Sequence, residues 1–318
     1  MKILVTGSSG LVGSALKHIV SNEEASGQTQ AHTYIYLTSK DGDLTNEAVV
    51  WGLFETHRPD VVVHLAANVG GLFKNMHRKA TMLEDNVLMN TLLLKYARQY
   101  AVQKIIVLLS TCVFPDGIEP LVETALHKGP PHPSNEGYAY AKRLMEVHSR
   151  IVTSQFGIQT VCLTPTNIYG PNDNYNLDDA HVIPALIHRC YLAKKENIPF
   201  VVKGSGKPLR QFIYSRDLAT IIHRIILAPT EHGYHSHLIC SPPSDKEVSI
   251  EYVARQIAKA MDYEHALTFD PSYADGQFKK TVEPNAALAS FEFTPFDVGI
   301  RETVTWFLEN VDLEGIRL

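Results

Sequence analysis

The chain has 318 residues, of which 45% are hydrophobic and 20% charged, and its formal net charge is −5. This length has room for about two domains. The net negative charge argues against nucleic acid or an anionic membrane surface as the main partner. No apolar run approaches the ~20 residues of a membrane span. The first residues lead into an apolar stretch without a signal-peptide pattern, and three of the four cysteines lie in apolar contexts, so we expect a cytoplasmic protein.

A glycine-spaced turn follows the first apolar run. Residues 2–6 predict a strand, and a helix begins near residue 14, so the segment has the form of the first half of a βαβ nucleotide site. The glycines suit a tight turn, a close approach of pyrophosphate and close packing of helix on strand. A glycine-rich turn without a ligand is the alternative interpretation. The predicted cofactor contacts are Gly7, Ser8, Ser9, Gly10, Leu11, Val12 and Gly13.

The second strand, over residues 34–37, ends where such sites usually carry an acidic residue that reads the ribose. Ser39 and Lys40 stand there instead, and a hydroxyl and an ammonium favour a 2′-phosphate. The sequence therefore predicts NADP(H) rather than NAD, with a solvated turn as the alternative. Asp43 and Leu44, which begin the next helix, complete the contacts expected here.

Further apolar runs cover residues 61–67 and 104–109, separated by a long helix expected over 75–100. Alternating strands and helices predict an α/β fold, a Rossmann doubly wound parallel sheet. After residue 165 the regular alternation of strands and helices ends and shorter elements follow, which predict a smaller α+β substrate-binding lobe. We expect an NADP-binding domain over 1–165, to which 206–235 returns, and a mainly substrate-binding lobe over 166–318.

Ser110 follows the fourth strand, and Tyr138 and Lys142 lie four residues apart on the next predicted helix. That spacing puts the phenol and the ammonium on one helix face. A positive charge favours phenolate, so we expect it to lower the phenol's pKa from about 10 toward the working pH. This is the chemistry needed at a carbonyl oxygen whose carbon gains or loses a hydride. The segment between these residues, 114–136, is rich in Pro, Gly and His and is expected to be a functional loop or lid.

These features together resemble the extended short-chain dehydrogenase/reductase family. Four stretches, at residues 110–115, 165–174, 180–184 and 275–280, resemble its GDP-L-fucose synthases. The resemblance spans nearly the whole chain. It implies an enzyme that uses NADPH to convert a GDP-4-keto-6-deoxy-mannose substrate to GDP-L-fucose, by epimerising carbons 3 and 5 of the sugar and then reducing the 4-keto group.

The resemblance also assigns roles to residues. Tyr138 is implied as the acid, supported by Ser110 and Lys142, and Cys112 and His181 as the epimerisation pair. A thiolate with a depressed pKa would remove the protons beside the keto group, and a histidine would return a proton to the other face. The further cofactor contacts implied are Leu65, Ala66, Ala67, Tyr138, Lys142, Pro165, Thr166, Asn167, Ile168 and His181. The substrate contacts implied are Asn167, Arg189, Lys203, Arg210, Asp275 and Lys280.

Two other classes of function stay open at this point: another nucleotide-sugar enzyme of the same fold, and a non-catalytic NADP-binding scaffold. A 4,6-dehydratase of this fold would carry an acidic pair where Cys112 and Val113 stand, and a simple 4-epimerase has no use for Cys112 with His181. A non-catalytic NADP-binding scaffold would not need the intact set of Ser110, Tyr138 and Lys142.

The sequence predicts no metal site. The four cysteines show no close-spaced ligand pattern, and we interpret the histidines at 232, 235 and 237 as loop residues. A homodimer through the helices at 75–100 and 137–156 is expected, as in related dimers.

Overall fold

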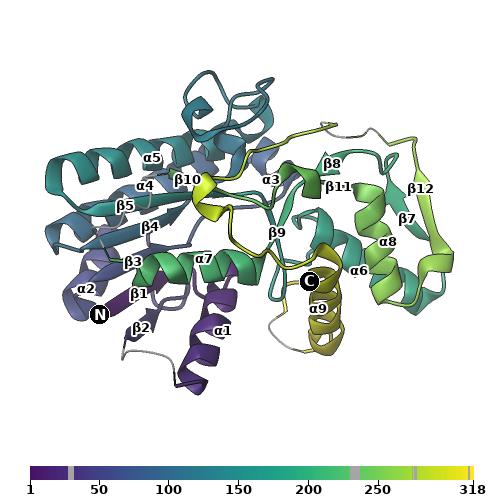
Figure 1. Ribbon diagram of the computed structural model, residues 1–318, viewed down its shortest axis with the longest axis horizontal. Coiled ribbons are helices and arrows are strands. Elements are labelled where there is room, and N and C mark those ends of the chain that lie inside the picture. The colour runs from purple at the N-terminus through teal and green to yellow at the C-terminus, as the bar shows by residue number, and fades with distance from the viewer. Residues whose placement is uncertain (28–31, 230–236, 274, 276–277, 314–315) are drawn as a thin grey trace.

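The computed structural model describes residues 1–27, 32–229, 237–273, 275, 278–313 and 316–318. Within these residues the central sheet has six parallel strands in the order β10-β5-β4-β3-β1-β2 (Figure 1). Because β1 lies between β2 and β3, the strand order reverses there, and open sheets of this kind bind ligands at that point. The strands are β1 (Lys2–Thr6), β2 (Thr33–Tyr36), β3 (Val61–His64), β4 (Lys104–Leu108), β5 (Gln159–Pro165) and β10 (His237–Cys240).

Alternate strand residues face two opposite layers of helices, because successive side chains of a strand point to opposite sides. Leu4 packs in a buried cluster with Phe54 and Leu93, whereas its neighbour Ile3 packs in a second cluster with Leu16. The sheet is therefore buried on both faces, as expected for a parallel sheet. The first cluster draws on α2 (Glu47–His57), α4 (Lys79–Gln99) and α5 (Glu136–Phe156), and the second on α1 (Leu11–Ala25) and α7 (Ser215–Leu227).

A smaller lobe follows beside the carboxyl ends of the strands (Figure 1). It has its own buried cluster, which includes Tyr169, Phe200, Val253 and Phe307. Three two-stranded pairs, β6–β9, β12–β7 and β11–β8, lie among its helices. Its elements are β6 (Asn167–Tyr169), α6 (Val182–Glu196), β7 (Phe200–Lys203), β8 (Leu209–Arg210), β9 (Phe212–Tyr214), β11 (Val248–Ser249), α8 (Ile250–Ala260), β12 (Leu267–Asp270) and α9 (Phe296–Asn310). The predicted doubly wound sheet with a smaller α+β lobe is confirmed.

Two predicted helices differ in detail. The single helix expected over 75–100 is two helices, α3 (Leu72–His77) and α4, because Arg78 between them leaves helical geometry at φ −123° and ψ 37°. The amphipathic pattern of residues 248–261 also predicts a helix, which begins in the structure at Ile250, since Val248 and Ser249 pair with β8. The second change follows from strand pairing with β8, which the hydrophobic pattern of a single segment does not indicate.

The loop at 114–136 packs onto the large domain, with Leu121, Ala125 and Leu126 in the first core cluster. It contains the short 3-10 helices η2 (Glu123–Ala125) and η3 (Pro133–Asn135), and η1 (Thr111–Val113) precedes it. Further 3-10 turns are η4 (Ser244–Lys246), η5 (Glu264–Ala266) and η6 (Ala286–Leu288).

The expected return of residues 206–235 to the large domain falls partly on 230–236, which lie outside the described residues. In the described part, α7 packs beside α1 and β10 pairs with β5. The domain boundaries themselves stay a prediction. None of the described helices is long and apolar enough to cross a membrane.

Candidate active site

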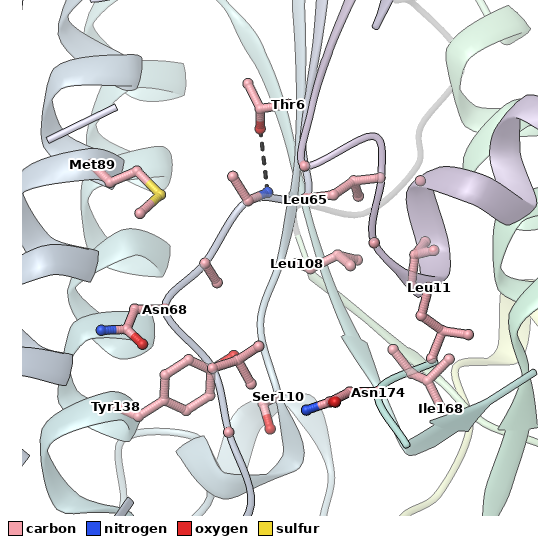
Figure 2. Close-up of a pocket in the computed structure, with 18 of the residues that line it drawn as sticks. Thr6, Leu11, Leu65, Asn68, Met89, Leu108, Ser110, Tyr138, Ile168 and Asn174 are labelled. Atoms are coloured by element: carbon pink, nitrogen blue, oxygen red, sulfur yellow. Dashed lines mark hydrogen bonds between the residues drawn. The ribbon is translucent and has the colours of Figure 1, made fainter. Parts of the chain in front are cut away.

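A cleft of about 840 Å³ lies at the carboxyl ends of β1, β3, β4 and β5, between the two lobes (Figure 2). Its volume is in the range of sites that take a cofactor or a drug-sized ligand. Thr6, Leu65, Leu108 and Pro165 come from the ends of the four strands. The topology therefore places the cleft at the reversal of strand order.

The glycine turn forms one wall of the cleft. Gly7 has φ +67°, and a Cβ there would lie 2.6 Å from the nitrogen of Ala66. A Cβ on Gly13 would lie 2.5 Å from the carbonyl oxygen of Gly7. Helix α1 begins with Gly10 as its N-cap and no side-chain cap, so its first N–H groups face the cleft without a side-chain partner. This cradle fits a dinucleotide pyrophosphate.

Six of the seven predicted turn residues line the cleft. Ser8 is the exception, because its side chain is fully buried and its hydroxyl has no hydrogen-bond partner in the described part of the chain. The residues that line the cleft are Gly7, Ser9, Gly10, Leu11, Val12 and Gly13.

A buried polar relay supports the turn from below. The hydroxyl of Thr6 and Nδ1 of His64 lie 2.8 Å apart, and Nε2 of His64 lies 3.0 Å from the amide oxygen of Asn90. The same hydroxyl accepts a bond of 3.3 Å from the main-chain N–H of Ala66 (Figure 2). Burial lowers the pKa of His64 to about 3, so the ring is neutral and holds β1, β3 and α4 together.

The end of β2 forms the far end of the cleft. Ser39, Asp43 and Leu44 line it, but Lys40 does not. The turn is fixed by Asp41, whose carboxylate accepts bonds of 2.7 and 2.9 Å from the N–H and hydroxyl of Thr38. The hydroxyl that we predicted to meet a 2′-phosphate is thus at the cleft wall, with the lysine beside it.

Ser110, Tyr138 and Lys142 all line the cleft, and Figure 2 shows that Ser110 and Tyr138 face the same part of it. Lys142 is only 2% exposed and donates a 2.8 Å bond to the carbonyl oxygen of Leu108. Its ammonium lies 5.6 Å from the centroid of the Tyr138 ring. The hydroxyl of Ser110 accepts a 3.4 Å bond from the N–H of Cys112. The helix and the strand end are therefore joined at this site.

The prediction that Lys142 brings the pKa of the phenol toward neutrality is wrong. Burial raises the pKa of Tyr138 above its usual value, and Cys112 adds to the rise. The pKa of Lys142 is lowered to about 8, again by burial. At neutral pH the phenol therefore keeps its proton and the lysine is still mainly charged. This state suits an acid with a cation ready to stabilise the phenolate that forms.

The predicted depressed pKa of Cys112 is also wrong. Burial raises the pKa of the thiol, and the bond from Ser110 and the charges of Lys280 and Lys142 offset only part of this rise. The sequence shows the cations but not the desolvation that outweighs them. The thiol still lines the cleft and remains partly exposed, so it can meet a ligand as an acid or, after losing its proton, as a base.

His181 is the N-cap residue of α6 and lines the cleft. Protein atoms surround the ring on most sides, which lowers its pKa despite the opposing effect of Asp179, while the cleft keeps it in contact with solvent. The main-chain oxygen of Asp179, two residues before it, accepts a 3.0 Å bond from the N–H of Gly71. The segment that carries the His181 imidazole is thus bonded to Gly71, just before α3.

The other predicted cofactor residues line the cleft as two short groups after β3 and at the end of β5. Asn167 is held by a 3.0 Å bond from its amide nitrogen to the main-chain oxygen of Gln211. The cleft-lining residues of these groups are Leu65, Ala66, Ala67, Pro165, Thr166, Asn167 and Ile168.

Only some of the predicted substrate residues of the smaller lobe lie at the cleft. Lys280 lines the cleft, but Arg189, Lys203, Arg210 and Asp275 do not. The charge of Arg210 nevertheless lowers the pKa of Lys280, after burial as the larger cause, so the two cations act on each other. Of the two, Lys280 is the one whose charge acts on Cys112.

Lys203 and Asp275 lie on the outer part of the lobe. The ammonium of Lys203 is 4.7 Å from the centroid of the Tyr273 ring. The carboxylate of Asp275 accepts bonds of 2.8 and 2.5 Å from the N–H and hydroxyl of Ser205, which closes the glycine turn after β7. Arg189 lies half-buried on α6.

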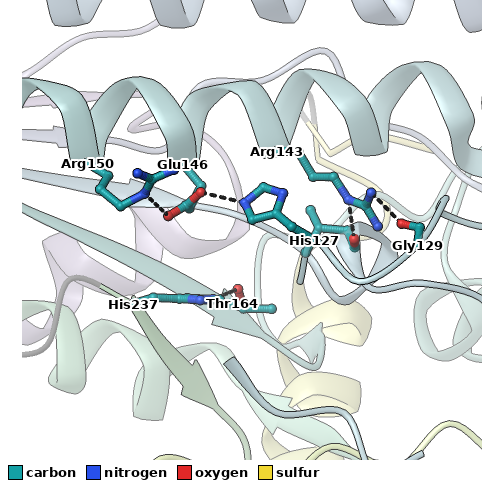
Figure 3. Close-up of polar contacts among 8 residues, drawn as sticks. His127, Gly129, Arg143, Glu146, Arg150, Thr164 and His237 are labelled. Carbon is teal, nitrogen blue, oxygen red and sulfur yellow. Dashed lines mark hydrogen bonds and ion pairs between the residues drawn. The ribbon is translucent and has the colours of Figure 1, made fainter. Parts of the chain in front are cut away.

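Arg143, next to Lys142 on α5, holds the loop that carries Cys112. Its guanidinium donates bonds of 2.6 and 2.7 Å to the carbonyl oxygens of Val113 and Gly129 (Figure 3). Farther along the helix, Glu146 accepts a 2.8 Å bond from His127 of the same loop. The 114–136 loop is therefore bonded to α5 at two points.

Several cleft residues escaped the sequence analysis. Asn68 donates a 2.8 Å bond to the carboxylate of Asp85, and Asn174 points into the cleft near Ser110 (Figure 2). Arg317 had no sequence signal, since it lies far along the chain from every motif. Asp173 and Asn174 belong to the stretch 165–174, which resembles the family, so their position at the cleft could have been predicted from the sequence. The missed residues include Thr6, Asn68, Asp85, Met89, Asp173, Asn174, Asp179 and Arg317.

Among the residues that the structure describes, no group of three His, Cys, Asp or Glu side chains could hold a metal ion. His232 and His235 lie outside these residues. His237 is described, and its Nε2 lies 2.7 Å from the hydroxyl of Thr164 (Figure 3).

Comparisons with known proteins agree with this geometry. Residues 3–238 match the model of the NAD dependent epimerase/dehydratase family. A GDP-L-fucose synthase of Dictyostelium discoideum is 43% identical over 314 residues, covering 98% of this chain and 96% of that protein. A probable GDP-L-fucose synthase of Drosophila melanogaster is 42% identical over 325 residues, covering 98% of both chains. A crystal structure of a GDP-L-fucose synthetase from Naegleria fowleri bound to NADP has a TM-score of 0.91 and 43% identity, with 100% of this chain and 95% of that chain covered.

Proposed function

This chain belongs to the NAD-dependent epimerase/dehydratase family, and on that premise we propose that it is a GDP-L-fucose synthase. It converts GDP-4-keto-6-deoxy-D-mannose to GDP-L-fucose by epimerising carbons 3 and 5 and reducing the 4-keto group. The observation that carries the proposal is that the reductase set Ser110, Tyr138 and Lys142 shares one cleft with Cys112 and His181. NADPH, when bound on the glycine turn, supplies the hydride for the reduction.

Epimerisation requires a base and an acid beside the carbons next to the keto group. We assign these roles to Cys112 and His181, which come from different lobes and can meet a sugar from two sides. The thiol must first lose a proton, and Lys142 and Lys280 are the charges that favour this loss. Ser110 and Tyr138 can hold the oxygen on which negative charge then develops.

Reduction requires a proton at the same oxygen. Tyr138 keeps its proton at neutral pH because burial raises the pKa of the phenol, so it can donate to the alkoxide that forms. The charge of Lys142 then stabilises the phenolate. Ser110 orients the oxygen from the strand side.

We assign the binding of the GDP-sugar diphosphate to two cations of the smaller lobe that act on each other. Lys280 and Arg210 provide positive charge for a diphosphate, and Arg offers a fork of two donors. Asn167 is assigned to the sugar. We keep Arg189, Lys203 and Asp275 as predicted contacts of the nucleotide on the outer lobe, reached by a substrate that extends out of the cleft.

The protein is proposed to be a homodimer. Helices α4 and α5 pack side by side, and their outer faces expose Leu83, Leu88, Tyr140, Leu144 and Ile151. Exposed apolar groups gathered on two adjacent helices indicate an interface. Light scattering of the wild type and of Leu144→Glu tests this, with a dimer expected for the first and dissociation for the second. The cytoplasmic location stays a prediction.

The decisive experiment incubates the protein with GDP-4-keto-6-deoxy-D-mannose and NADPH. We expect oxidation of NADPH in step with formation of GDP-L-fucose, identified by its proton couplings in NMR. Oxidation with a product of unchanged configuration at carbons 3 and 5 would leave only a 4-reductase. Absence of NADPH oxidation would refute the proposed function.

A further inference from the structure

Residues 316–318 lie against the segment 172–176, which forms part of the cleft wall. Arg317 forms an isolated parallel β-bridge with Asn174. The main-chain oxygen of Arg317 accepts a 2.8 Å bond from the N–H of Tyr175. Its guanidinium donates a 2.7 Å bond to the carbonyl oxygen of Asn172. Asn172 itself has φ +65°, so this bond secures a backbone conformation that L-residues rarely adopt. Arg317 thus bonds the 172–175 segment at both of its ends, Asn172 and Tyr175.

Asn176 connects residues 316–318 to the turn that precedes His181. Its side-chain nitrogen donates a 2.9 Å bond to the main-chain oxygen of Leu318, and its side-chain oxygen accepts a 2.9 Å bond from the N–H of Asp178. Its main-chain oxygen accepts bonds of 3.1 and 2.7 Å from the N–H groups of Asp179 and Ala180. The turn that ends at His181 is therefore built around a side chain that Leu318 holds.

Arg317 also lines the cleft, as does Asp173, and its charge acts on that carboxyl. Asp173 is only 5% exposed; its Oδ1 accepts a 2.7 Å bond from the N–H of Asn174, and its Oδ2 has no hydrogen-bond partner within the described chain. Arg317 is the charge that favours the ionised form of this carboxyl. The strap formed by residues 316–318 thus places a cation at the cleft wall as well as bonding it.

We propose that Arg317 is a positioning residue for epimerisation, which holds the 172–180 segment so that His181 faces the sugar. This inference rests on the proposed function for its catalytic consequence. It assigns no contact between Arg317 and the reacting carbons. Tyr138 and Lys142 lie on α5 in the large domain and do not depend on this segment, so the reduction step is independent of the strap.

The first test compares Arg317→Met with wild type in deuterated buffer containing the keto sugar nucleotide and NADPH. A displacement of about 1 Å in a catalytic group costs on the order of 10²-fold. We therefore expect inversion at carbons 3 and 5 to fall about 10²-fold, while deuterium still enters through Cys112 and KM for NADPH is unchanged. Reduction continues, so a GDP-6-deoxyhexose that keeps its original configuration accumulates. A loss of overall stability alone would lower all products together.

Matched variants separate positioning from a general loss of charge. Arg301 is an exposed arginine on α9, so Arg301→Met is the control and should keep the wild-type product. Arg317→Lys keeps the charge and one donor and should recover part of the inversion rate. Asn176→Ala should show the same product shift, and the double variant with Arg317→Met should lose less than the product of the two separate effects, because both act through one segment.

A second readout does not need the substrate. Hydrogen exchange followed by mass spectrometry should show faster exchange in the peptide covering 172–181 of Arg317→Met, and unchanged exchange in β1 and α1. If wild type makes no GDP-L-fucose, the proposed function fails, and this measurement alone decides the strap. Unchanged protection of 172–181 would overturn the inference, as would normal product ratios from Arg317→Met in an active enzyme.

Discussion

The ammonium of Lys142 donates a 2.8 Å hydrogen bond to the main-chain oxygen of Leu108, the last residue of β4. Ser110 lies two residues beyond that oxygen, so the bond fixes α5 relative to the strand end. The same bond keeps the lysine charge close to the Tyr138 ring. Lys142 is therefore a tether as well as a charge, and the pKa of the phenol is set by burial.

The first prediction concerns Tyr138→Phe. Without the phenolic proton the alkoxide formed by reduction is not protonated, and positioned acid catalysis contributes about 10²–10⁴-fold. We expect NADPH oxidation to fall by that factor, while fluorescence titration shows nearly unchanged NADPH binding. Tyr252→Phe, exposed on α8 of the smaller lobe, is the control. A near wild-type rate for Tyr138→Phe would remove Tyr138 from the role of acid.

The second prediction concerns the choice of cofactor. NADPH should bind more tightly than NADH, because Ser39 stands at the cleft wall where an acidic residue would repel the 2′-phosphate. Ser39→Asp should weaken NADPH binding by more than about tenfold and leave NADH binding nearly unchanged, since juxtaposed like charges cost several kcal/mol. Ser154→Asp, exposed on α5, controls for added charge. Equal affinities of the wild type for both cofactors would contradict the assignment.

The fold was accessible from the sequence because its signals are local. Apolar runs such as 61–65 mark buried parallel strands, and the spacing of Gly7, Gly10 and Gly13 marks the turn. The break at Arg78 was not accessible, since the residues around it have ordinary helix propensities and the geometry comes from packing.

Most of the residues that the sequence singles out line the cleft, but the sequence does not give their electrostatics. The sequence places Lys142 near Tyr138 and cations near Cys112, and from those charges alone both pKa values should fall. Burial raises both pKa values instead, and the degree of burial depends on how the folded chain encloses the cleft. Arg317 was missed for a related reason, because only the folded chain brings residue 317 beside residue 174.

The third prediction links Asp173 to the pH dependence of stability. Burial raises the pKa of this carboxyl from 3.8 to about 7. Between these values the folded state holds a proton that the unfolded state has lost, so stability is intact below pH about 4 and falls as pH rises to about 7. Each pH unit in that window costs about 1.4 kcal/mol.

Asp173→Asn removes this titration while keeping an oxygen for the N–H of Asn174. Relative to wild type, the free energy of unfolding of the variant should increase by on the order of 2 kcal/mol between pH 5 and pH 8. Urea unfolding at both values measures it, with the exposed Asp245→Asn as the control. The same difference at both pH values would show that Asp173 ionises normally.

The last prediction separates the two halves of the reaction. Cys112→Ser should stop or severely slow exchange of the protons at carbons 3 and 5 with deuterated water, because a hydroxyl yields almost no anion at neutral pH. Ser110, Tyr138 and Lys142 remain, so the variant should still reduce unepimerised keto sugar. In wild type the exchange rate should rise about tenfold per pH unit from pH 6 to 8, since the raised pKa of Cys112 leaves little thiolate in that range.

His181→Asn should behave differently. Proton removal by Cys112 persists, but no group returns a proton to the opposite face, so deuterium enters without inversion. NMR and mass analysis of sugar recovered from deuterated buffer distinguishes the variants, and Cys190→Ser, buried in the smaller lobe, controls for loss of a thiol. Full deuterium incorporation and normal GDP-L-fucose from Cys112→Ser would return Cys112 to a structural role. Its partly exposed position beside Lys280 would then serve to bind the substrate.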